Sequence, residues 1–221
     1  MIISLTTIPS RVEYIKPCID SLLQQGLPIH IWLPDVVRRT GKKFRVIPGF
    51  LYEEGIEVHI VEDLGPITKL LPALKAGFKE VITADDDRIY GKGWANGLIK
   101  YSKEYPDSVI CYRGRILNGP NYSKSRLVGR PKKVTEVDLV TGTFGALYKD
   151  RFFSKEIFNE WEQWERNDDL VVSTHLKNRG VRILAVPCNC KIRHTKASKI
   201  NNLFAENKRL NTKGIKELGL E

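Results

Sequence analysis

Strand-like apolar runs alternate with helical patterns along most of the 221 residues of this chain. Residues 2–6, 29–33, 56–61 and 80–84 are short runs dominated by apolar side chains, and residues 11–25 carry apolar side chains at helical spacing. Alternation of this kind predicts βαβ units, in which helices join parallel strands and cover the faces of the sheet. We therefore expect an α/β fold with a mainly parallel central sheet flanked by helices.

The same rhythm predicts helices over residues 68–76, 93–104 and 168–178, and strands over residues 108–112, 137–140 and 181–186. Residues 113–133 interrupt it, because they are rich in Gly, Pro, Asn, Ser and basic residues. A loop of that length is usually functional, and we expect it to cross the active face. No internal repeat or linker is evident. We expect a single catalytic domain over residues 1–196 and a basic helix or tail over residues 197–221.

The chain is basic, with 36 Lys and Arg against 26 Asp and Glu, a net charge of +10. This charge favours anionic partners: nucleic acid, an anionic membrane surface or a nucleotide diphosphate. No aromatic-basic RNA motif or helix-turn-helix pattern is evident, which argues against nucleic acid. The basic tail is a candidate for peripheral contact with an anionic membrane. No apolar run approaches the ~20 residues of a membrane span, and the N-terminus lacks a basic signal-peptide region, so we expect a cytoplasmic location.

Cysteine and most of the histidine residues suggest no site. Four cysteines are scattered along the chain, and only Cys188 and Cys190 are close together. Without a second close pair, a thiolate metal site is not expected. Three histidines fall within strand or helix patterns and receive no functional assignment: His30, His59 and His175.

Three consecutive carboxylates, Asp85, Asp86 and Asp87, follow directly on the apolar run at residues 80–84. Adjacent acids repel one another, whereas Mg²⁺ and Mn²⁺ prefer carboxylate oxygen and bridge readily to phosphates. The strand also places them at a sheet edge, where ligands of open α/β sheets bind. Extended geometry would direct Asp85 and Asp87 to one side and Asp86 to the other. A solvated acidic turn is the alternative interpretation.

Two polar turns that lead into helices are candidates for binding anionic groups. The first contains Thr6, Thr7, Pro9 and Arg11, and backbone N–H groups at such a turn favour anionic oxygens. The second carries Lys69 in the first turn of the following helix, where a cation is unfavourable against the helix dipole. A bound diphosphate would offset that cost. The alternatives are an ordinary polar turn and a surface lysine.

Asp168 and Asp169 open a predicted helix. Carboxylates are favoured there by the positive end of the helix dipole, so Asp168 has a purely capping interpretation. The functional alternative is a general base that takes a proton from an attacking hydroxyl. Trp161 and Trp164 precede the pair and are candidates either for stacking on a sugar ring or for core packing.

Four motifs, in this order, resemble the GT-A family of nucleotide-sugar glycosyltransferases over roughly residues 1–196. The acidic triplet resembles the family's Asp-x-Asp motif, and residues 141–146 look like its acceptor-side loop. Asp168 and Asp169 are similar to the paired acids of inverting members, and His194 is placed like the late histidine of the metal site. The family's usual Glu-Asp is Asp-Asp here, which leaves the base open between the two acids.

The resemblance implies a GT-A fold and a hexosyltransferase. This enzyme would use Mn²⁺ or Mg²⁺ to move a sugar from a UDP-sugar donor, with inversion, to a hydroxyl of a glycan or lipid-linked acceptor. It implies that Asp87, Asp85 and His194 bind the metal and that Asp169 or Asp168 is the base. The implied contacts to the nucleotide sugar are Thr6, Thr7, Pro9, Arg11, Lys69, Asp85 and Asp86. The implied acceptor-side loop comprises Gly142, Thr143, Phe144 and Gly145.

A sugar-phosphate nucleotidyltransferase of related fold is the main enzymatic alternative. Proteins of that class usually carry a Gly-rich loop followed by Arg and Lys after the first strand, whereas residues 6–11 contain no glycine. A basic nucleic-acid-binding protein is the alternative from another class. It would account for the net charge but not for carboxylates at the end of a buried strand.

Overall fold

The computed structural model describes residues 1–160, 167–200, 204–217 and 219–220. Its α-helices are α1 (Lys16–Leu23), α2 (Leu71–Lys75), α3 (Trp94–Glu104), α4 (Ile157–Glu160), α5 (Asp168–Asn178) and α6 (Phe204–Glu217). Its strands are β1 (Ile2–Thr6), β2 (Ile29–Pro34), β3 (Ile56–Val61), β4 (Glu80–Thr83), β5 (Arg88–Tyr90), β6 (Ser108–Cys111), β7 (Arg113–Ile116), β8 (Arg126–Gly129), β9 (Thr135–Val137), β10 (Leu139–Val140), β11 (Ala146–Lys149), β12 (Arg182–Ala185) and β13 (Ile192–His194). Trp161 and Trp164 lie outside the described residues.

Eight strands form the central sheet, in the order β3-β2-β1-β4-β11-β6-β12-β9. β1 runs parallel to β2 and β4, β2 runs parallel to β3, and β6 runs parallel to β12. β11 is antiparallel to β4 and β6, and β9 is antiparallel to β12. The predicted α/β fold with a mostly parallel sheet is confirmed.

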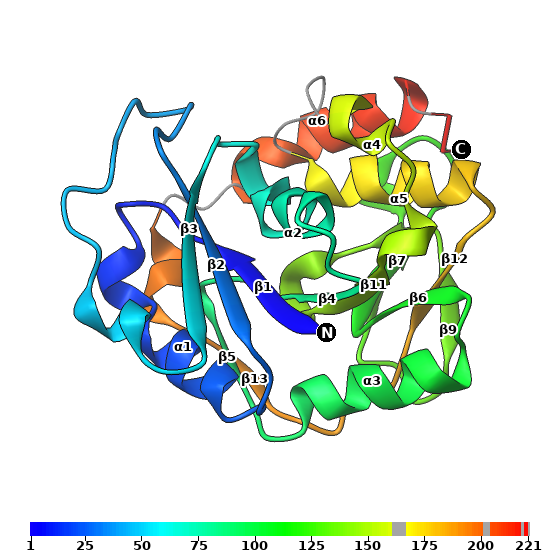
Figure 1. The fold of residues 1–221 in the computed structure, drawn as a ribbon. Coiled ribbons are helices and arrows are strands. Elements are labelled where there is room, and N and C mark those ends of the chain that lie inside the picture. The colour runs from blue at the N-terminus through cyan, green and yellow to red at the C-terminus, as the bar shows by residue number, and fades with distance from the viewer. Residues whose placement is uncertain (161–166, 201–203, 218, 221) are drawn as a thin grey trace.

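Helices cover both faces of this sheet, with α1 and α3 on one face and α2 and α5 on the other (Figure 1). Adjacent residues of one strand are buried in two different apolar cores, one on each face of the sheet. Ile3 and Ile82 are buried on the side of α1 and α3, whereas Ile2 and Val81 are buried on the side of α2 and α5. Because successive side chains of a strand point to opposite faces, a sheet covered on both faces requires continuous apolar runs.

The structure corrects the sequence prediction at four places. Residues 88–90 and 192–194, for which no strand was predicted, form β5 and β13, which pair with each other. Residues 113–133, expected as an irregular loop, contain β7 and β8, which pair with each other. Residues 137–140, expected as one strand, are divided between β9 in the central sheet and β10 in a smaller sheet. Residues 146–149 form β11, which was not predicted and inserts between β4 and β6. Such short strands depend on partners far away in the chain more than on their own composition.

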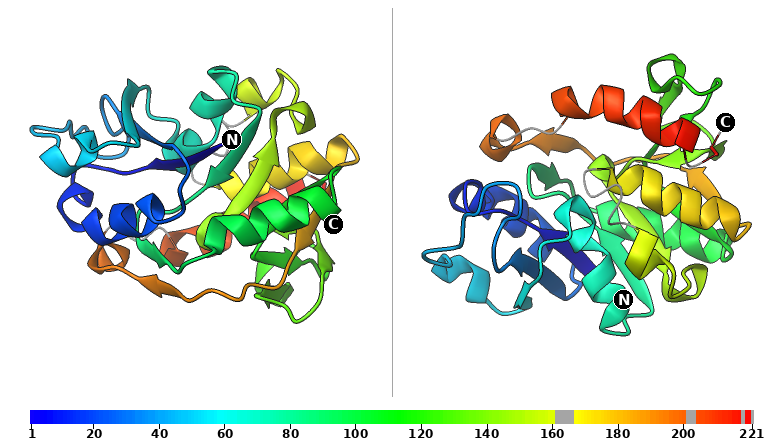
Figure 2. Two further views of the ribbon diagram at one scale, coloured as in Figure 1. Left: turned by 60° about the horizontal axis from the view of Figure 1, so that its bottom comes forward. Right: turned by 90° about the horizontal axis from the view of Figure 1, so that it is seen from above.

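Two smaller sheets and a C-terminal helix complete the described fold. The smaller sheets are β10-β7-β8 and β13-β5. Helix α6 packs on α5 and on the 3₁₀ turn Tyr122–Lys124 (Figure 2). Ile215 and Leu220 are buried there with Leu139 and Leu170. Of the described helices, none has the length and apolar character that a membrane-spanning helix needs.

Candidate active site

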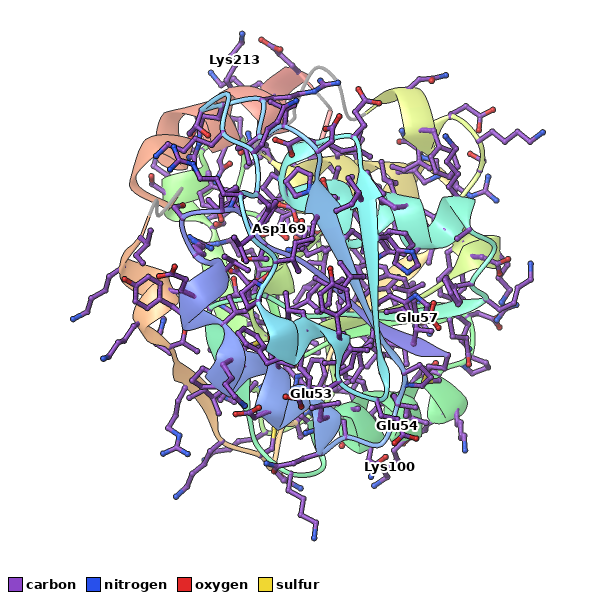
Figure 3. The ribbon with its side chains drawn as sticks, turned by 60° about the vertical axis from the view of Figure 1, so that its left-hand side comes forward. Glu53, Glu54, Glu57, Lys100, Asp169 and Lys213 are labelled. Atoms are coloured by element: carbon purple, nitrogen blue, oxygen red, sulfur yellow. The ribbon has the colours of Figure 1, made fainter. Side chains whose placement is uncertain are left out.

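A cavity of about 600 Å³ opens beyond the carboxyl-terminal ends of the parallel strands. Its wall includes residues at or just after four of these ends: Thr7 after β1, Pro34 in β2, Asp63 after β3 and Asp85 after β4. In Figure 3, Asp169, which also lines the cavity, lies on the side toward which these strands run. This edge is where open α/β sheets bind their ligands.

Most of the predicted site residues meet in this cavity, although they come from distant parts of the chain. Those that line it are Thr6, Thr7, Arg11, Lys69, Asp85, Asp86, Asp87, Gly142, Thr143, Asp168, Asp169 and His194. Three predicted residues do not line it: Pro9, Phe144 and Gly145.

Asp86 connects the acidic triplet to the polar turn that contains Thr7 and Arg11. Thr7 Oγ1 donates to Asp86 Oδ2 at 2.6 Å, and Arg11 Nη1 lies 2.8 Å from Asp86 Oδ1. Burial raises the pKa of Asp86, and the positive charge of Arg11 opposes that effect. Arg11 Nε also donates to the Ile200 carbonyl oxygen at 2.9 Å. Both Asp86 oxygens are therefore engaged in fixing the wall of the cavity.

Lys69 connects the acidic triplet with the acid pair of α5. Its Nζ lies 2.9 Å from Asp85 Oδ1 and 3.0 Å from Asp168 Oδ2. Burial disfavours the charge on Lys69, yet Asp168 and Asp85 hold the pKa of its ammonium group well above the ordinary value. Burial likewise opposes the charge on Asp85, but Lys69 holds the pKa of that carboxyl below its usual range. Lys69 is thus a fixed cation between two acids.

Asp87 is the member of the triplet whose charge is least compensated. Its Oδ1 is buried and accepts no hydrogen bond from the described residues, although Arg88 Nη1 lies 3.4 Å away. Burial and the neighbouring negative charge of Asp85 raise the pKa of Asp87 to about 6. A buried oxygen in this state is a suitable ligand for a cation.

A divalent cation fits the carboxylates of this site better than it fits His194. Asp85 and Asp87 offer the hard oxygen ligands that Mg²⁺ and Mn²⁺ prefer. The ligand atoms of Asp85, Asp87 and His194, however, do not all lie within 4.8 Å of one another. His194 is paired directly with Arg88 in the β5–β13 ladder, and Arg88 Nη1 donates to His194 Nδ1. The Arg88 guanidinium therefore contacts His194, for which the resemblance implies a contact with the metal.

Asp169 connects the acid pair of α5 with the loop predicted to face the acceptor. The Gly142 backbone N–H donates to Asp169 Oδ1 at 2.9 Å. Burial and the negative charge of Asp168 raise the pKa of Asp169 to about 7. A carboxylate with a pKa near the working pH and an oxygen left for substrate is suited to general base catalysis. Asp168, in contrast, is paired with Lys69.

Sequence reasoning missed an arginine cluster in the wall of the cavity. Arg88, Arg113 and Arg115 all line it, and the Nε atom of each is buried without a hydrogen-bond partner among the described residues. Thr141 Oγ1 is in the same state. Buried polar atoms are normally satisfied, so several unsatisfied donors in one cavity indicate a polar, anionic ligand. The alternation of Arg113 and Arg115 about Gly114 was the signal available in the sequence.

Phe144 and Gly145 have structural contacts outside the cavity. The Phe144 ring lies under the guanidinium groups of Arg113 and Arg130, 5.1 and 5.0 Å from its centroid. Trp94 Nε1 donates to the Phe144 carbonyl oxygen at 2.7 Å. Gly145 has φ +100°, and a Cβ built on it would lie 2.4 Å from Trp94 Cζ2. This position therefore requires glycine for packing.

We expect Gly145→Ala to lower the free energy of unfolding by about 2–4 kcal/mol, because it adds steric overlap with Trp94 to backbone strain. Urea unfolding measures this loss. Gly77→Ala is the matched control, since Gly77 has φ +86° but nothing within 4 Å of the added Cβ. Equal losses in the two variants would show that contact with Trp94 does not determine the cost.

Comparison with known proteins supports the fold. No protein-family model matches the chain, and no curated protein sequence matches it. Among solved structures, residues 1–349 of TarS from S. aureus, a GT-A-type glycosyltransferase, superpose with a TM-score of 0.50 at 18% identity. That match covers 84% of this chain and 58% of the TarS chain. The chain therefore spans less than two thirds of the length of that structure.

Two further solved structures superpose over almost the whole chain. The UDP-GlcNAc complex of the same TarS fragment has a TM-score of 0.56 at 15% identity, covering 97% of this chain and 66% of that one. A protein from Bacillus anthracis assigned as a glucose-1-phosphate thymidylyltransferase has a TM-score of 0.51 at 13% identity, covering 96% and 94%. At these identities the similarity shows the fold alone. The chain has the GT-A-like fold of nucleotide-sugar transferases.

Proposed function

We propose that this protein is a glycosyltransferase of the hexosyltransferase type. It would move a sugar from a UDP-sugar donor to a hydroxyl of a glycan or lipid-linked acceptor. The reaction would depend on Mn²⁺ or Mg²⁺ and would invert the anomeric centre. One observation carries the proposal: a single cavity contains Asp87, whose Oδ1 accepts no hydrogen bond from the described residues, the cations Lys69 and Arg88, and the candidate base Asp169. The fold shared with a protein crystallised with UDP-GlcNAc supports the same assignment.

Asp169 is the residue that would activate the acceptor. With Oδ1 engaged by the Gly142 N–H, Oδ2 is the oxygen that would take the proton from the acceptor hydroxyl. The hydroxyl oxygen then forms a bond to the anomeric carbon, and the bond from that carbon to the diphosphate oxygen breaks. The electron pair of the broken bond leaves with UDP. Attack from the face opposite the leaving group gives inversion.

The leaving diphosphate needs positive charge. Asp87 and Asp85 would hold the divalent cation, which when bound supplies Lewis-acid neutralisation of the diphosphate. Lys69 stands beside Asp85, and Arg88 stands beside Asp87. Both side chains would interact with phosphate oxygens when the acids that now pair with them turn toward the cation. Arg113 and Arg115 add donors in the same cavity.

We expect kcat/KM for the UDP-sugar to rise with pH through about 7. Asp169 must be ionised to accept a proton, and its raised pKa of about 7 keeps it neutral below that pH. Deprotonation of Asp87, with a pKa of about 6, would contribute at the lower end of the range. A pH profile of UDP release measures the rise. A profile that falls through this range would contradict a carboxylate base.

A sugar-phosphate nucleotidyltransferase is the second candidate. The observation in its favour is the superposition on the Bacillus anthracis protein, which covers 94% of that chain. Against it, the turn after β1 lacks the Gly-rich loop of that class, and Thr7 and Arg11 are engaged with Asp86.

Calorimetric titration with UDP tests donor binding directly. We expect UDP to bind in the presence of Mn²⁺ and to bind at least about tenfold more weakly after EDTA treatment, with ADP as the nucleotide control. Tight binding that EDTA leaves unchanged would assign the diphosphate to Arg88 and its neighbouring cations and remove the metal from the account. Failure to bind UDP under either condition would overturn the donor assignment.

A further inference from the structure

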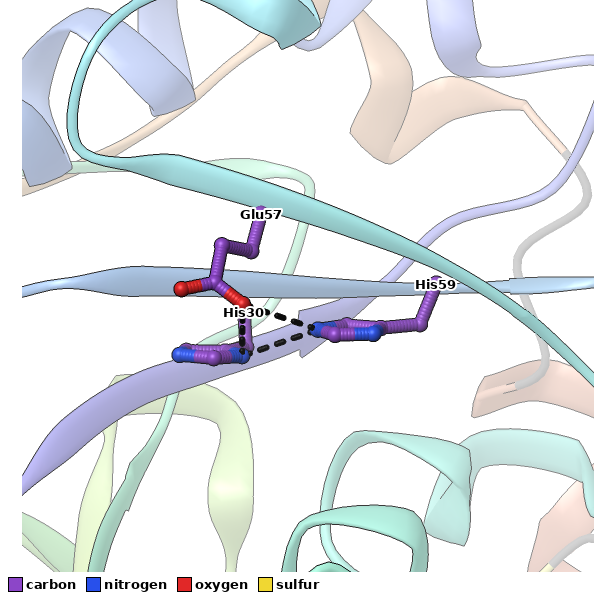
Figure 4. Close-up of side chains that lie close together, drawn as sticks. All are labelled: His30, Glu57 and His59. Carbon is purple, nitrogen blue, oxygen red and sulfur yellow. Dashed lines mark hydrogen bonds and ion pairs between the residues drawn. The ribbon is translucent and has the colours of Figure 1, made fainter.

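Three metal-binding side chains meet on the outer part of the central sheet. His30 lies on β2, and Glu57 and His59 lie on the edge strand β3. His30 is paired with Glu57 in the parallel ladder, and the next residues of the same face, Trp32 and His59, are paired too. Because residues two apart on a strand share a face, all three metal-binding side chains project to the same side (Figure 4).

The three donor atoms are spaced as a small cation requires. His30 Nδ1 lies 2.9 Å from His59 Nε2, and Glu57 Oε2 lies 3.7 Å and 3.8 Å from these two nitrogens. A point equidistant from three atoms so separated is about 2.0 Å from each, which is the length of zinc–nitrogen and zinc–oxygen bonds. Within the described part of the chain, this is the one group of three or more His, Cys, Asp or Glu residues that converges within 4.8 Å.

We propose that His30, Glu57 and His59 form a binding site for a divalent transition metal, zinc above all, separate from the active-site cavity. Two imidazoles and one carboxylate favour zinc and its first-row neighbours over Mg²⁺ or Ca²⁺, which require mostly oxygen ligands. Three protein ligands leave a fourth position for water or for a side chain of a partner.

The surroundings hold the ligands in place and leave an entry route. His30 is 4% exposed, and its ring contacts the Phe78 ring edge-on at 4.6 Å. Trp32 stacks on His59 at 4.3 Å. The Glu57 side chain is 64% exposed and the His59 side chain 32%, so a metal can enter from solvent.

Binding would replace an existing hydrogen bond. In the hydrogen bond between the facing nitrogens of His30 and His59, one nitrogen carries the proton and the other accepts it. With metal, the ring protons must lie on His30 Nε2 and His59 Nδ1, and the partly exposed His59 ring must rotate so that its lone pair meets the ion.

Zinc titration of the untagged, EDTA-treated protein tests this site. We expect one zinc ion to bind at this site, and we expect His59→Gln and Glu57→Gln each to weaken that binding by at least about tenfold. Glu57 is exposed and His59 is partly exposed on an edge strand, so these variants should fold. Glu54→Gln, an exposed glutamate outside the cluster, is the matched control and should bind zinc as the wild type does.

Further variants distinguish the proposed site from two other possible zinc sites. Cys188 Sγ and Cys190 Sγ lie 3.0 Å apart, and Asp87 has a buried carboxylate oxygen in the active-site cavity that accepts no hydrogen bond from the described residues. We expect Cys188→Ser and Asp87→Asn to retain the site and the Co²⁺ spectrum to lack a thiolate charge-transfer band. Wild-type affinity in His59→Gln and Glu57→Gln, loss of the site in Cys188→Ser or Asp87→Asn, or no zinc binding at all would each overturn the proposal. None of these outcomes depends on glycosyl transfer.

Discussion

Asp87→Asn is expected to lower kcat/KM for UDP-sugar hydrolysis at least about 100-fold, which corresponds to about 2.7 kcal/mol of lost transition-state stabilisation. Asp87 lines the cavity, and its Oδ1 is a buried acidic oxygen that no described residue satisfies by a hydrogen bond. An amide keeps its shape but removes the charge that would hold the cation. UDP released from UDP-sugar in Mn²⁺, with water as acceptor, measures the loss.

The same variant should be at least as stable as the wild type at pH 8. The pKa of Asp87 is raised in the folded protein, so the ionised form is less favourable there than in the unfolded chain. Above about pH 6 this difference destabilises the fold, and a neutral Asn removes it. Asp107→Asn, at an exposed aspartate paired with Arg151, is the control and should leave hydrolysis unchanged. Wild-type hydrolysis in Asp87→Asn would remove this residue from catalysis.

Asp169→Asn is expected to lower kcat by about 10²–10⁴-fold and to leave UDP binding nearly unchanged. Asn can still accept the Gly142 N–H through its amide oxygen, so the loop keeps its anchor. What the variant loses is the ability to take a proton from the acceptor. Steady-state kinetics gives kcat, and UDP calorimetry gives donor affinity.

Asp168→Asn distinguishes the role of Asp168 from that of Asp169, the two acids at the start of α5. Asp168 is paired with Lys69, so its substitution should disturb donor binding more than the proton transfer. We also expect the rise of kcat/KM with pH to persist in Asp168→Asn. An inactive Asp168→Asn with a nearly active Asp169→Asn would assign the base to Asp168 instead.

The central fold was predictable because its signals are local. The runs at residues 2–6, 29–33 and 80–84 became parallel strands, and the acid pair opens α5 as expected. The missed strands are three or four residues long and depend on distant partners. β5 pairs with β13 about a hundred residues later, and β11 forms only between β4 and β6. No window of sequence contains that information.

The convergence of most of the candidate site residues in one cavity was predictable, but their pairing with one another was not. Residue types and strand ends were enough to bring Lys69, the acidic triplet and the acid pair to one edge of the sheet. The partner of His194 depends on the β5–β13 register, which sets it opposite Arg88. Arg113 likewise reaches the cavity from a strand that the sequence suggested to be loop. Ladder register is a property of the folded chain.

The central claim is that the protein transfers a sugar from a UDP-sugar and does not transfer a nucleotide to a sugar phosphate. One paired assay tests this claim. The wild-type protein is incubated with Mn²⁺ and either a panel of UDP-sugars or UTP with sugar 1-phosphates, and UDP and pyrophosphate are quantified. We predict release of UDP from at least one UDP-sugar and no pyrophosphate from UTP. Pyrophosphate formation without UDP release would contradict the account and assign the cavity to nucleotidyl transfer.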